Sequence, residues 1–477
     1  MFTPFKSFLF LLSCLLLLGG VSFFFGDKEY LLLNNYSFKI FNLKTYFRSS
    51  QISKKDSVEN AIQSITHIEK EVDSITAPPE NIIRADTLKI KRILQPLQLD
   101  QNFVSLIEYP NDDRRQWNYF ANALSQASQK STHILYFGDS QIEEDRFSGL
   151  LRQKLQSIYG GSGCGLLPIM PVAQWIYPKI KYSDNWYKWD CFADAGKKDE
   201  YYGIMAQTFL MDFGKGSAKW TARCDANVLP FNCLFNKVTL YYGQSKEPVK
   251  VKFFNNNELV DEQILESKNI FDKKIFAVKN CDEISLELEG FESPYIYGVS
   301  LESFDNGVYV DNISLRGASG TFFHLIDKNL LKHFWDDLNV SLVILQFGGN
   351  VMPMIDSEEK AKQYGDYINY QLKIIKSIRP EVPVLFVGPS DMSVNIDGIM
   401  QTHPYLESVI HYIKQAVFKN GYAFFDMYKA MGGKNSMPVW VQENIAAKDY
   451  IHFSPQGARK MATLIYYSLM KDLQTSN

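Results

Sequence analysis

The amino-acid sequence predicts an α/β protein in which an antiparallel β-sandwich interrupts a parallel sheet. The first observation is a short apolar run, "THILYF", that leads through a polar turn into an amphipathic helix. The second is the alternation of apolar runs and helices over residues 307–477, which is typical of a parallel sheet covered on both faces. The third is the segment 172–306, where short runs alternate apolar and polar residues as antiparallel strands do.

The composition of the chain limits the classes of function. Its 477 residues, 46% hydrophobic and 22% charged, are enough for two or three domains with their own cores. The formal net charge of -3 and the pI near 6.2 give no basic surface, so we expect no nucleic-acid partner. No CxxC or HExxH motif occurs, and the sequence therefore predicts neither a metal site nor a cofactor.

The N-terminal segment predicts a membrane anchor. Phe8–Phe25 is uncharged and close to the roughly 20 residues that span a bilayer. This run exceeds the roughly 7–15 residues of a usual signal-peptide core, and no small-x-small cleavage motif follows it. A cleaved signal peptide and lipidation at Cys14 are the alternatives. We expect residues 1–26 to form a transmembrane signal anchor, with the rest of the chain outside the cytoplasm.

Residues 27–105 are predicted to form a polar stalk. They contain charge clusters, the pair Pro78 and Pro79, and one amphipathic helix around Val58–Ile75. No core-forming pattern makes this stretch a domain, so we expect it to hold the rest of the chain away from the membrane.

The α/β domain is predicted in two parts, residues 106–171 and 307–477. The first part contains a helix, the buried strand "THILYF" and the helix "RFSGLLRQKLQSIYG". The second part contains the strands "VSLVILQ", "VPVLFV" and "YAFFDMY", separated by helices, and a long terminal helix. The sandwich at 172–306 follows the first strand-turn-helix unit, where an insertion is tolerated if its two ends lie close together.

Ser140 is the candidate nucleophile. It lies in "FGDSQ", on the turn where a strand ends, and open parallel sheets bind ligands beyond the carboxyl ends of their strands. The first backbone N–H groups of the next helix would face a developing oxyanion there. A serine at this position is also an ordinary helix cap.

His452 is the candidate base. Of the 7 histidines, it is the one on a loop just before the terminal helix, in "KDYIHFSPQGARK". Asp449 lies three residues earlier and can hold the Nδ1–H of the ring, which leaves Nε2 to accept the serine proton. Asp-x-x-His is common by chance, so the argument depends on its position.

Two further loops supply candidate oxyanion donors. Asn350 follows the strand in "VSLVILQFGGN", where its amide could donate to an oxyanion, although Asn is also common in tight turns. Gly317, in "SLRGASG", could present a backbone N–H with no side chain in the way, or belong to a merely flexible loop.

In this order, Ser140, Gly317, Asn350 and the Asp449/His452 pair resemble the four sequence blocks of the SGNH (GDSL-like) hydrolase superfamily. The resemblance implies a flavodoxin-like, three-layer α/β/α fold. It implies that Ser140 is the nucleophile and that Asp449 orients His452 as the base. It also implies an oxyanion hole made by the Ser140 N–H, the Gly317 N–H and the Asn350 side chain.

The resemblance covers nearly the whole chain from about Ile107, with two departures. Gln141 stands where the family usually has Leu, and Val351 stands where Asp or Glu commonly follows the Asn. Neither position is expected to carry the chemistry, so the departures concern the subfamily more than the activity.

The branch of the family is indicated by "GDSQIEEDRFSGLLRQKLQSIYGGSGCGLLP", "GPSDMS" and "FFDMYKAMGGKNSMPVW". These segments look like the branch of bacterial peptidoglycan O-acetyl esterases, which carries a carbohydrate-binding-module-like jelly roll as an insertion. The resemblance implies a serine-dependent acetyl esterase in the periplasm, anchored in the inner membrane, that acts on acetylated glycan through an acetyl-Ser140 intermediate. An extracytoplasmic O-acetyltransferase and a non-catalytic glycan-binding envelope protein are the alternatives.

Two clusters near these motifs allow a structural and a functional interpretation. Trp175, Trp186 and Trp189 fall near the junction of the two domains, where they would be buried or form a sugar-stacking wall. The acidic residues 143–145 would be stabilised by the dipole of the helix after Ser140, or would hold sugar hydroxyls.

Overall fold

The computed structural model describes residues 4–25, 29–32, 36–39, 55–76, 104–175, 178–192, 199, 201–212, 217–223, 233–279 and 283–475. The chain divides into two compact units, residues 1–60 and 61–477. In the first unit, helix α1 (Pro4–Phe25) covers the segment predicted as an anchor, and β1 (Glu29–Leu32) pairs antiparallel with β2 (Tyr36–Lys39). Among the helices of the described residues, none is long and apolar enough to cross a bilayer.

The second unit is built on a parallel sheet with the strand order β16-β4-β17-β18-β21 and an antiparallel edge strand, β3. Counted along the chain, the parallel strands lie in the order 2-1-3-4-5, which is the flavodoxin-like arrangement. These strands are buried along almost their whole length, as expected for a parallel sheet with helices on both faces. Their bounds are β3 (Ile107–Glu108), β4 (Thr132–Gly138), β16 (Val308–Ser314), β17 (Val340–Gln346), β18 (Val384–Val387) and β21 (Ala423–Phe425).

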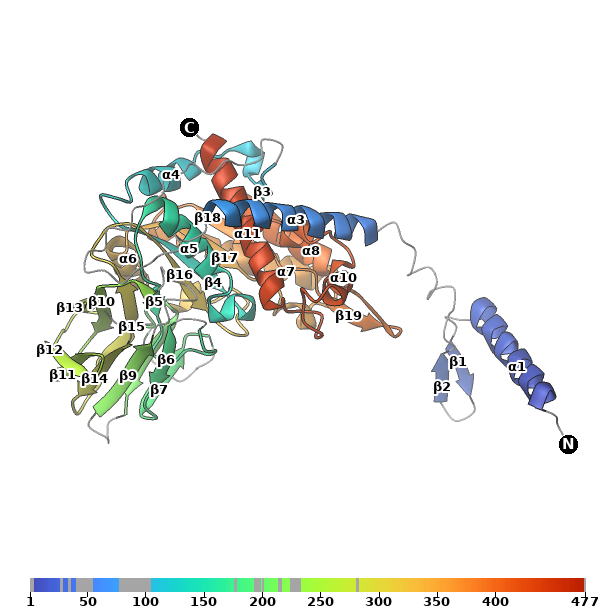
Figure 1. Cartoon of the computed structure of the whole chain (residues 1–477), viewed down its shortest axis with the longest axis horizontal. Helices are drawn as coiled ribbons and strands as arrows, with labels where there is room; N and C mark the ends of the chain where they lie inside the picture. The colour runs from blue at the N-terminus through green and yellow to red at the C-terminus, as the bar shows by residue number, and fades with distance from the viewer. Residues whose placement is uncertain are drawn as a thin grey trace. The chain divides into compact units, whose positions relative to one another are not determined.

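Two layers of helices accompany this sheet (Figure 1). Helix α5 packs against α11, whereas α6, α7 and α8 pack on one another in series. The two groups of helices follow from right-handed crossovers. The chain moves from β4 to β16 in one direction across the sheet, and from β16 through β17, β18 and β21 in the opposite direction, so the connecting helices lie on opposite faces. The helices are α4 (Trp117–Ser125), α5 (Ser148–Tyr159), α6 (Lys328–Asp337), α7 (Glu358–Ile378), α8 (Leu406–Lys419), α9 (Met427–Ala430), α10 (Ser436–Gln442) and α11 (Pro455–Thr475).

The register of the sheet brings the carboxyl ends of its central strands into one row. Gly138, at the end of β4, pairs with Ser314 of β16 on one side and with Gln346 of β17 on the other. Gln346 in turn pairs with Val387 of β18. The loops that follow these strands therefore meet at one edge of the sheet, where folds of this kind bind their ligands.

The predicted insertion is an antiparallel sandwich of two sheets, coloured green to yellow in Figure 1. One sheet has the order β13-β10-β15-β8-β7 with β5 paired to β15, and the other has the order β12-β11-β14-β9-β6. Alternate residues of β11, Val249, Val251 and Phe253, are buried between the sheets, as in other sandwiches. The strands are β5 (Gly165–Leu167), β6 (Lys179–Tyr182), β7 (Trp186–Asp190), β8 (Gln207–Met211), β9 (Ser217–Arg223), β10 (Lys237–Gly243), β11 (Val249–Asn255), β12 (Glu258–Leu265), β13 (Asp272–Ala277), β14 (Glu283–Glu289) and β15 (Tyr295–Glu302).

Helix α3 (Lys55–Thr76) forms where the sequence predicts a helix within the stalk. Lys460 of α11 donates from Nζ to Thr66 Oγ1 at 2.7 Å and lies 3.0 Å from Glu69 Oε2. The side chain of Lys460 is buried, so the part of α3 around Thr66 and Glu69 packs directly on α11. A stalk that holds the domain away from the membrane would not pack on it in this way. Most of the rest of the predicted stalk, 40–54 and 77–103, lies outside the described residues.

Candidate active site

Ser140, His452 and Asp449 form a continuous hydrogen-bonded chain. Ser140 Oγ lies 2.8 Å from His452 Nε2, and His452 Nδ1 lies 2.8 Å from Asp449 Oδ2. The other oxygen of Asp449, Oδ1, accepts the backbone N–H of Ile451 at 2.9 Å and that of His452 at 3.0 Å. The structure therefore brings together the three residues predicted as nucleophile, base and orienting acid.

The charge of Asp449 follows from these contacts. Partial burial acts to raise the pKa of Asp449, but the hydrogen bonds from the backbone and ring of His452 outweigh it and hold the pKa below its usual value. An ionised Asp449 favours the proton on Nδ1 of His452, which leaves Nε2 free to accept the proton of Ser140.

Ser140 lies on a tight turn at the end of β4. The turn is a short 3-10 helix, Ser140–Asp145, and Asp139 caps it by accepting the Gln141 N–H on Oδ1 at 2.9 Å. A Cβ at Gly138 would lie 2.9 Å from the Ile142 side chain, so a glycine lets the turn fold back closely. The serine is thus held at the edge of the sheet where the strand ends.

The loops with the two predicted oxyanion donors meet beside this turn. Asn350 Nδ2 donates to Asp139 Oδ2 and to the Ala318 carbonyl, each at 3.1 Å. Ala318 directly follows Gly317, so Asn350 links the Gly317 loop to the turn of the nucleophile. Gly317 has a φ of +80° and open space where a Cβ would lie, so a glycine is favoured there by the backbone conformation.

Asp139 is a buried carboxyl group directly before the nucleophile. Burial raises its pKa from 3.8 to about 6, although the hydrogen bond from Gln141 and the nearby His452 act to lower it. Above this pH the ionised carboxylate accepts a hydrogen bond from Asn350 Nδ2, which fixes the direction of the Asn350 side chain.

The site opens into a cavity of about 150 Å³. Ser140, His452 and Asn350 lie on its polar side. Apolar side chains form most of the remaining wall, namely Phe347, Pro353, Pro389, Met392, Met427 and Ile451. An acetyl ester fits within this volume. In the parts of the chain that the structure describes, no group of three or more His, Cys, Asp or Glu is placed to hold a metal ion.

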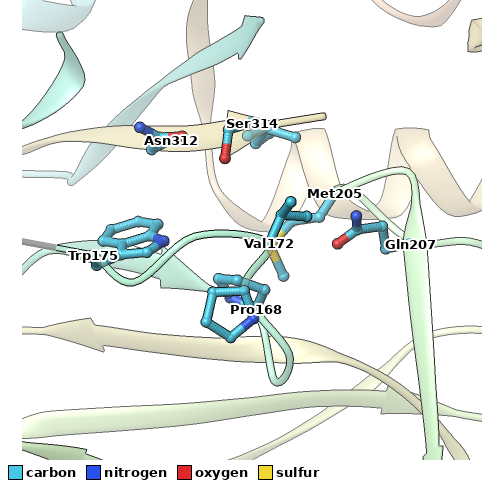
Figure 2. A pocket seen from close by; sticks show the side chains of 9 residues that line it. Pro168, Val172, Trp175, Met205, Gln207, Asn312 and Ser314 are labelled. Carbon is cyan, nitrogen blue, oxygen red and sulfur yellow. The ribbon is translucent and has the colours of Figure 1, made fainter. Parts of the chain in front are cut away.

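A second cavity, of about 10 Å³, lies under the sandwich insertion. Figure 2 shows Asn312 and Ser314 of β16 on one side of it, and Pro168 and Trp175 on the other. A space of this volume holds about one water molecule, so it is too small for a substrate.

The three tryptophans near the domain junction do not form an exposed wall. Trp175 is 2% exposed and Trp186 is 4% exposed. Trp189 is partly buried and packs against the same core. The structural interpretation of this cluster is therefore confirmed.

Two of the three acidic residues after the nucleophile, Glu143 and Asp145, form ion pairs. None of the three lies in the first turn of a regular helix, because α5 begins only at Ser148. Arg316 donates from Nε to Glu143 Oε1 at 2.7 Å and from Nη2 to Oε2 at 2.6 Å. Arg316 directly precedes Gly317, so this bidentate ion pair connects the Gly317 loop to the turn that carries Ser140. Asp145 pairs with Arg152, and both side chains are fully buried.

Gln141 and Arg316 have no role assigned from the sequence, and Glu143 was considered only as a residue stabilised by a helix dipole or as one that holds sugar hydroxyls. In the structure, Gln141 contacts the loop that carries His452, and the other two join the Gly317 loop. The signal available in the sequence was their position, since each lies within three residues of Ser140 or Gly317. Their partners could not be read from spacing, because the contacts are tertiary.

The Ser140–His452–Asp449 chain, placed at the carboxyl ends of a parallel sheet, is the arrangement of nucleophile, base and orienting acid found in serine hydrolases. The chain shares its fold with a solved structure of a peptidoglycan O-acetylesterase, at 20% sequence identity and a TM-score of 0.60. The similarity covers 78% of this chain and 99% of that chain. The resemblance to SGNH hydrolases is thus confirmed at the level of the fold.

Two other solved structures match smaller parts of the chain. An acetyl xylan esterase, AlAXEase, is 15% identical with a TM-score of 0.26, over 33% of this chain and 80% of that chain. A GDSL-like lipase from Parabacteroides merdae is 12% identical with a TM-score of 0.25, over 35% of this chain and 73% of that chain. No model of a known protein family and no curated protein matches the sequence.

Proposed function

We propose that this protein is a serine-dependent carbohydrate acetyl esterase of the cell envelope that removes O-acetyl groups from peptidoglycan. The observation that carries the proposal is the hydrogen-bonded chain from Ser140 through His452 to Asp449, which faces a cavity large enough for an acetyl ester. The fold shared with a peptidoglycan O-acetylesterase supports the choice of substrate.

The first half of the reaction transfers the acetyl group to the enzyme. Ser140 Oγ attacks the carbonyl carbon of the ester while His452 Nε2 takes the hydroxyl proton. When the tetrahedral intermediate collapses, the bond between the carbonyl carbon and the sugar oxygen breaks. His452 then gives its proton to the sugar oxygen, and the products of this step are a free sugar hydroxyl and acetyl-Ser140.

The second half returns the enzyme to its starting state. A water molecule attacks the acetyl carbon as His452 takes one of its protons, and the bond to Ser140 Oγ breaks when His452 returns that proton to the serine. Acetate leaves. If a second sugar hydroxyl took the place of water, the same residues would catalyse acetyl transfer, so the exclusion of water decides between the two reactions.

The negative charge of each tetrahedral intermediate requires hydrogen-bond donors. The Ser140 N–H, the Gly317 N–H and the Asn350 side chain are the proposed donors. Both hydrogens of Asn350 Nδ2 already have acceptors, Asp139 and the Ala318 carbonyl, at 3.1 Å each. In the intermediate, the oxyanion would take the place of the neutral Ala318 carbonyl as the acceptor of one of these hydrogens. The hydrogen bond to Asp139 would keep the amide directed at the site.

The proposed location follows from the substrate and the N-terminal segment. Peptidoglycan lies outside the cytoplasmic membrane, and the apolar run Phe8–Phe25 is the part of the sequence suited to export or anchoring. We place the catalytic domain in the periplasm, held at the inner membrane by residues 1–26. Accessibility of the domain to a protease added to spheroplasts tests this location, since a cytoplasmic domain would stay protected.

Acetate release tests the proposed activity. Purified full-length protein is incubated with O-acetylated peptidoglycan and, in parallel, with acetylated xylan, each with and without an unacetylated glycan as acceptor. Ser140→Ala is compared with Ser377→Ala, a control on α7 outside the site. We expect acetate from peptidoglycan in the wild type and the control and none in Ser140→Ala.

The other outcomes separate the alternatives. Acetyl groups that appear on the acceptor without free acetate would identify a transferase. Release from xylan alone would overturn the substrate. Glycan binding by Ser140→Ala, with no turnover by the wild type on either polymer, would identify a binding protein that lacks catalysis.

A further inference from the structure

Gln141 connects the nucleophile to the loop that carries the base. It directly follows Ser140, and its side chain is buried. Its Nε2 donates to the Ile451 carbonyl at 2.7 Å, and its Oε1 accepts the Phe453 N–H at 3.3 Å. Ile451 and Phe453 are the two neighbours of His452, so one amide holds both peptide groups that flank the base.

We propose that Gln141 is a positioning residue that fixes His452 relative to Ser140 through these two hydrogen bonds. This inference rests on the proposed function and adds a residue to its machinery. Gln141 does not touch the reacting atoms. It acts by linking the backbone of the nucleophile's turn to the backbone on either side of the histidine.

The loop that carries His452 needs such a restraint because its backbone is strained. Tyr450, between Asp449 and Ile451, has a φ of 60°, in the left-handed region that bulky residues rarely adopt. Such a conformation persists when surrounding contacts over-determine it. The Tyr450 carbonyl accepts the Ser393 N–H at 3.1 Å, and Gln141 supplies the two bonds on the next residues.

The chemistry of the two contacts requires a side-chain amide. The Ile451 carbonyl needs a donor and the Phe453 N–H needs an acceptor, and a glutamine offers both from one rigid group. A leucine or methionine of similar size fills the space but makes neither bond. An ionised glutamate keeps the acceptor, loses the donor and brings a negative charge next to His452.

The test uses three variants of Gln141 and one matched control. Gln141→Leu and Gln141→Met remove both hydrogen bonds while they keep the volume, and Gln141→Glu removes one. The control is Gln371→Met, because Gln371 is also buried and also forms hydrogen bonds to a histidine. Its Oε1 accepts the backbone N–H of His324 at 3.2 Å, and its Nε2 lies 3.1 Å from the ring nitrogen Nδ1 of His324. His324 is not part of the site.

Two readouts are measured on full-length protein. The first is the rate at which an organophosphonofluoridate labels Ser140, a step in which the Oγ–P bond forms, fluoride leaves and His452 takes the hydroxyl proton. This rate reports the serine–histidine pair whatever the natural substrate is. The second is kcat and KM for a soluble acetyl ester as a function of pH, with urea unfolding as a check on folding.

We expect Gln141→Leu and Gln141→Met to lower the labelling rate and kcat by about 10²-fold with little change in KM, because a displaced base fails in the chemical step. Gln371→Met should keep both rates, even where it loses as much stability. Gln141→Glu keeps one of the two hydrogen bonds, so its labelling rate and kcat should lie between those of the other two variants and the wild type.

The proposal is overturned if Gln141→Met labels and turns over at the wild-type rate. It is also overturned if Gln371→Met loses as much activity, since the effect would then be one of general stability. If the wild type itself is not labelled at Ser140, the proposed function fails and the positioning role fails with it. Labelled wild type with equally fast variants would remove the role of Gln141 alone.

Discussion

Replacing Asp139 by Asn should make the stability of the protein less dependent on pH. The folded protein buries the carboxyl group of Asp139, and burial raises its pKa from 3.8 to about 6. Because the folded-state pKa lies above the unfolded-state value, the folded state binds this proton more tightly. The stability that this proton contributes is fully present below pH 3.8 and is lost as the pH rises through about 6. An asparagine does not titrate and avoids the loss.

The size of the effect follows from the two pKa values. One pKa unit corresponds to about 1.4 kcal/mol, so the change from 3.8 to about 6 corresponds to on the order of 3 kcal/mol of unfolding free energy. Asparagine has one side-chain oxygen for the two N–H donors that Asp139 accepts, those of Gln141 and Asn350, so the substitution also loses one hydrogen bond. That loss changes the stability at every pH in the range. The informative quantity is therefore the change of the difference with pH.

Urea unfolding of the wild type and Asp139→Asn between pH 4 and pH 8 measures this quantity. Other titrating groups are the same in both proteins, so their contributions cancel. Relative to the variant, the wild type should lose on the order of 3 kcal/mol of stability over this range. A difference that does not change with pH would refute the burial argument, and a gain in stability toward neutral pH would show that the pKa of Asp139 is lowered.

Three further substitutions test other contacts of the site. Asn350→Ala should lower kcat by roughly 10²–10³-fold if its amide stabilises the oxyanion, whereas a change confined to KM would make it a binding residue. Arg316→Ala should release the Gly317 loop and lower kcat by up to about 10²-fold, and an unchanged kcat on a soluble acetyl ester would contradict this. Arg152→Met leaves Asp145 buried without its cation and should cost about 3–5 kcal/mol of unfolding free energy in urea. Adding Asp145→Asn should recover part of that cost, and no recovery would show that the ion pair is not the cause.

The secondary structure was predictable where the apolar residues of a segment follow one regular pattern. The centres of β4 and β17, "ILYF" and "LVIL", are apolar without alternation, which indicates strands buried on both faces. In β11 every second residue is apolar, and those residues face the sandwich core. The order of the strands in the parallel sheet came from the family resemblance, since periodicity does not state which strand lies beside which.

The site was predictable at positions where chemistry and topology coincide. Ser140 and Asn350 follow apolar strands, and a parallel sheet brings such positions to one edge. Gln141 and Arg316 could not be placed in the same way, because their partners lie 310 and 173 residues away in the chain. The helix predicted from Arg146 onward is present as α5, but the expected contact of the acidic residues with its dipole is not: Glu143 and Glu144 have non-helical backbones, and Glu143 pairs with Arg316 instead.

The most direct test of the central claim is to detect the acetylated serine. Wild type and His452→Ala are mixed with an O-acetylated glycan, quenched with acid within one turnover, and digested for mass spectrometry. The wild-type peptide containing Ser140 should transiently gain the mass of one acetyl group at that serine, and the same peptide of His452→Ala should not. Acetate release by the wild type without any acetyl group on Ser140, or with the group on another residue, would contradict the account.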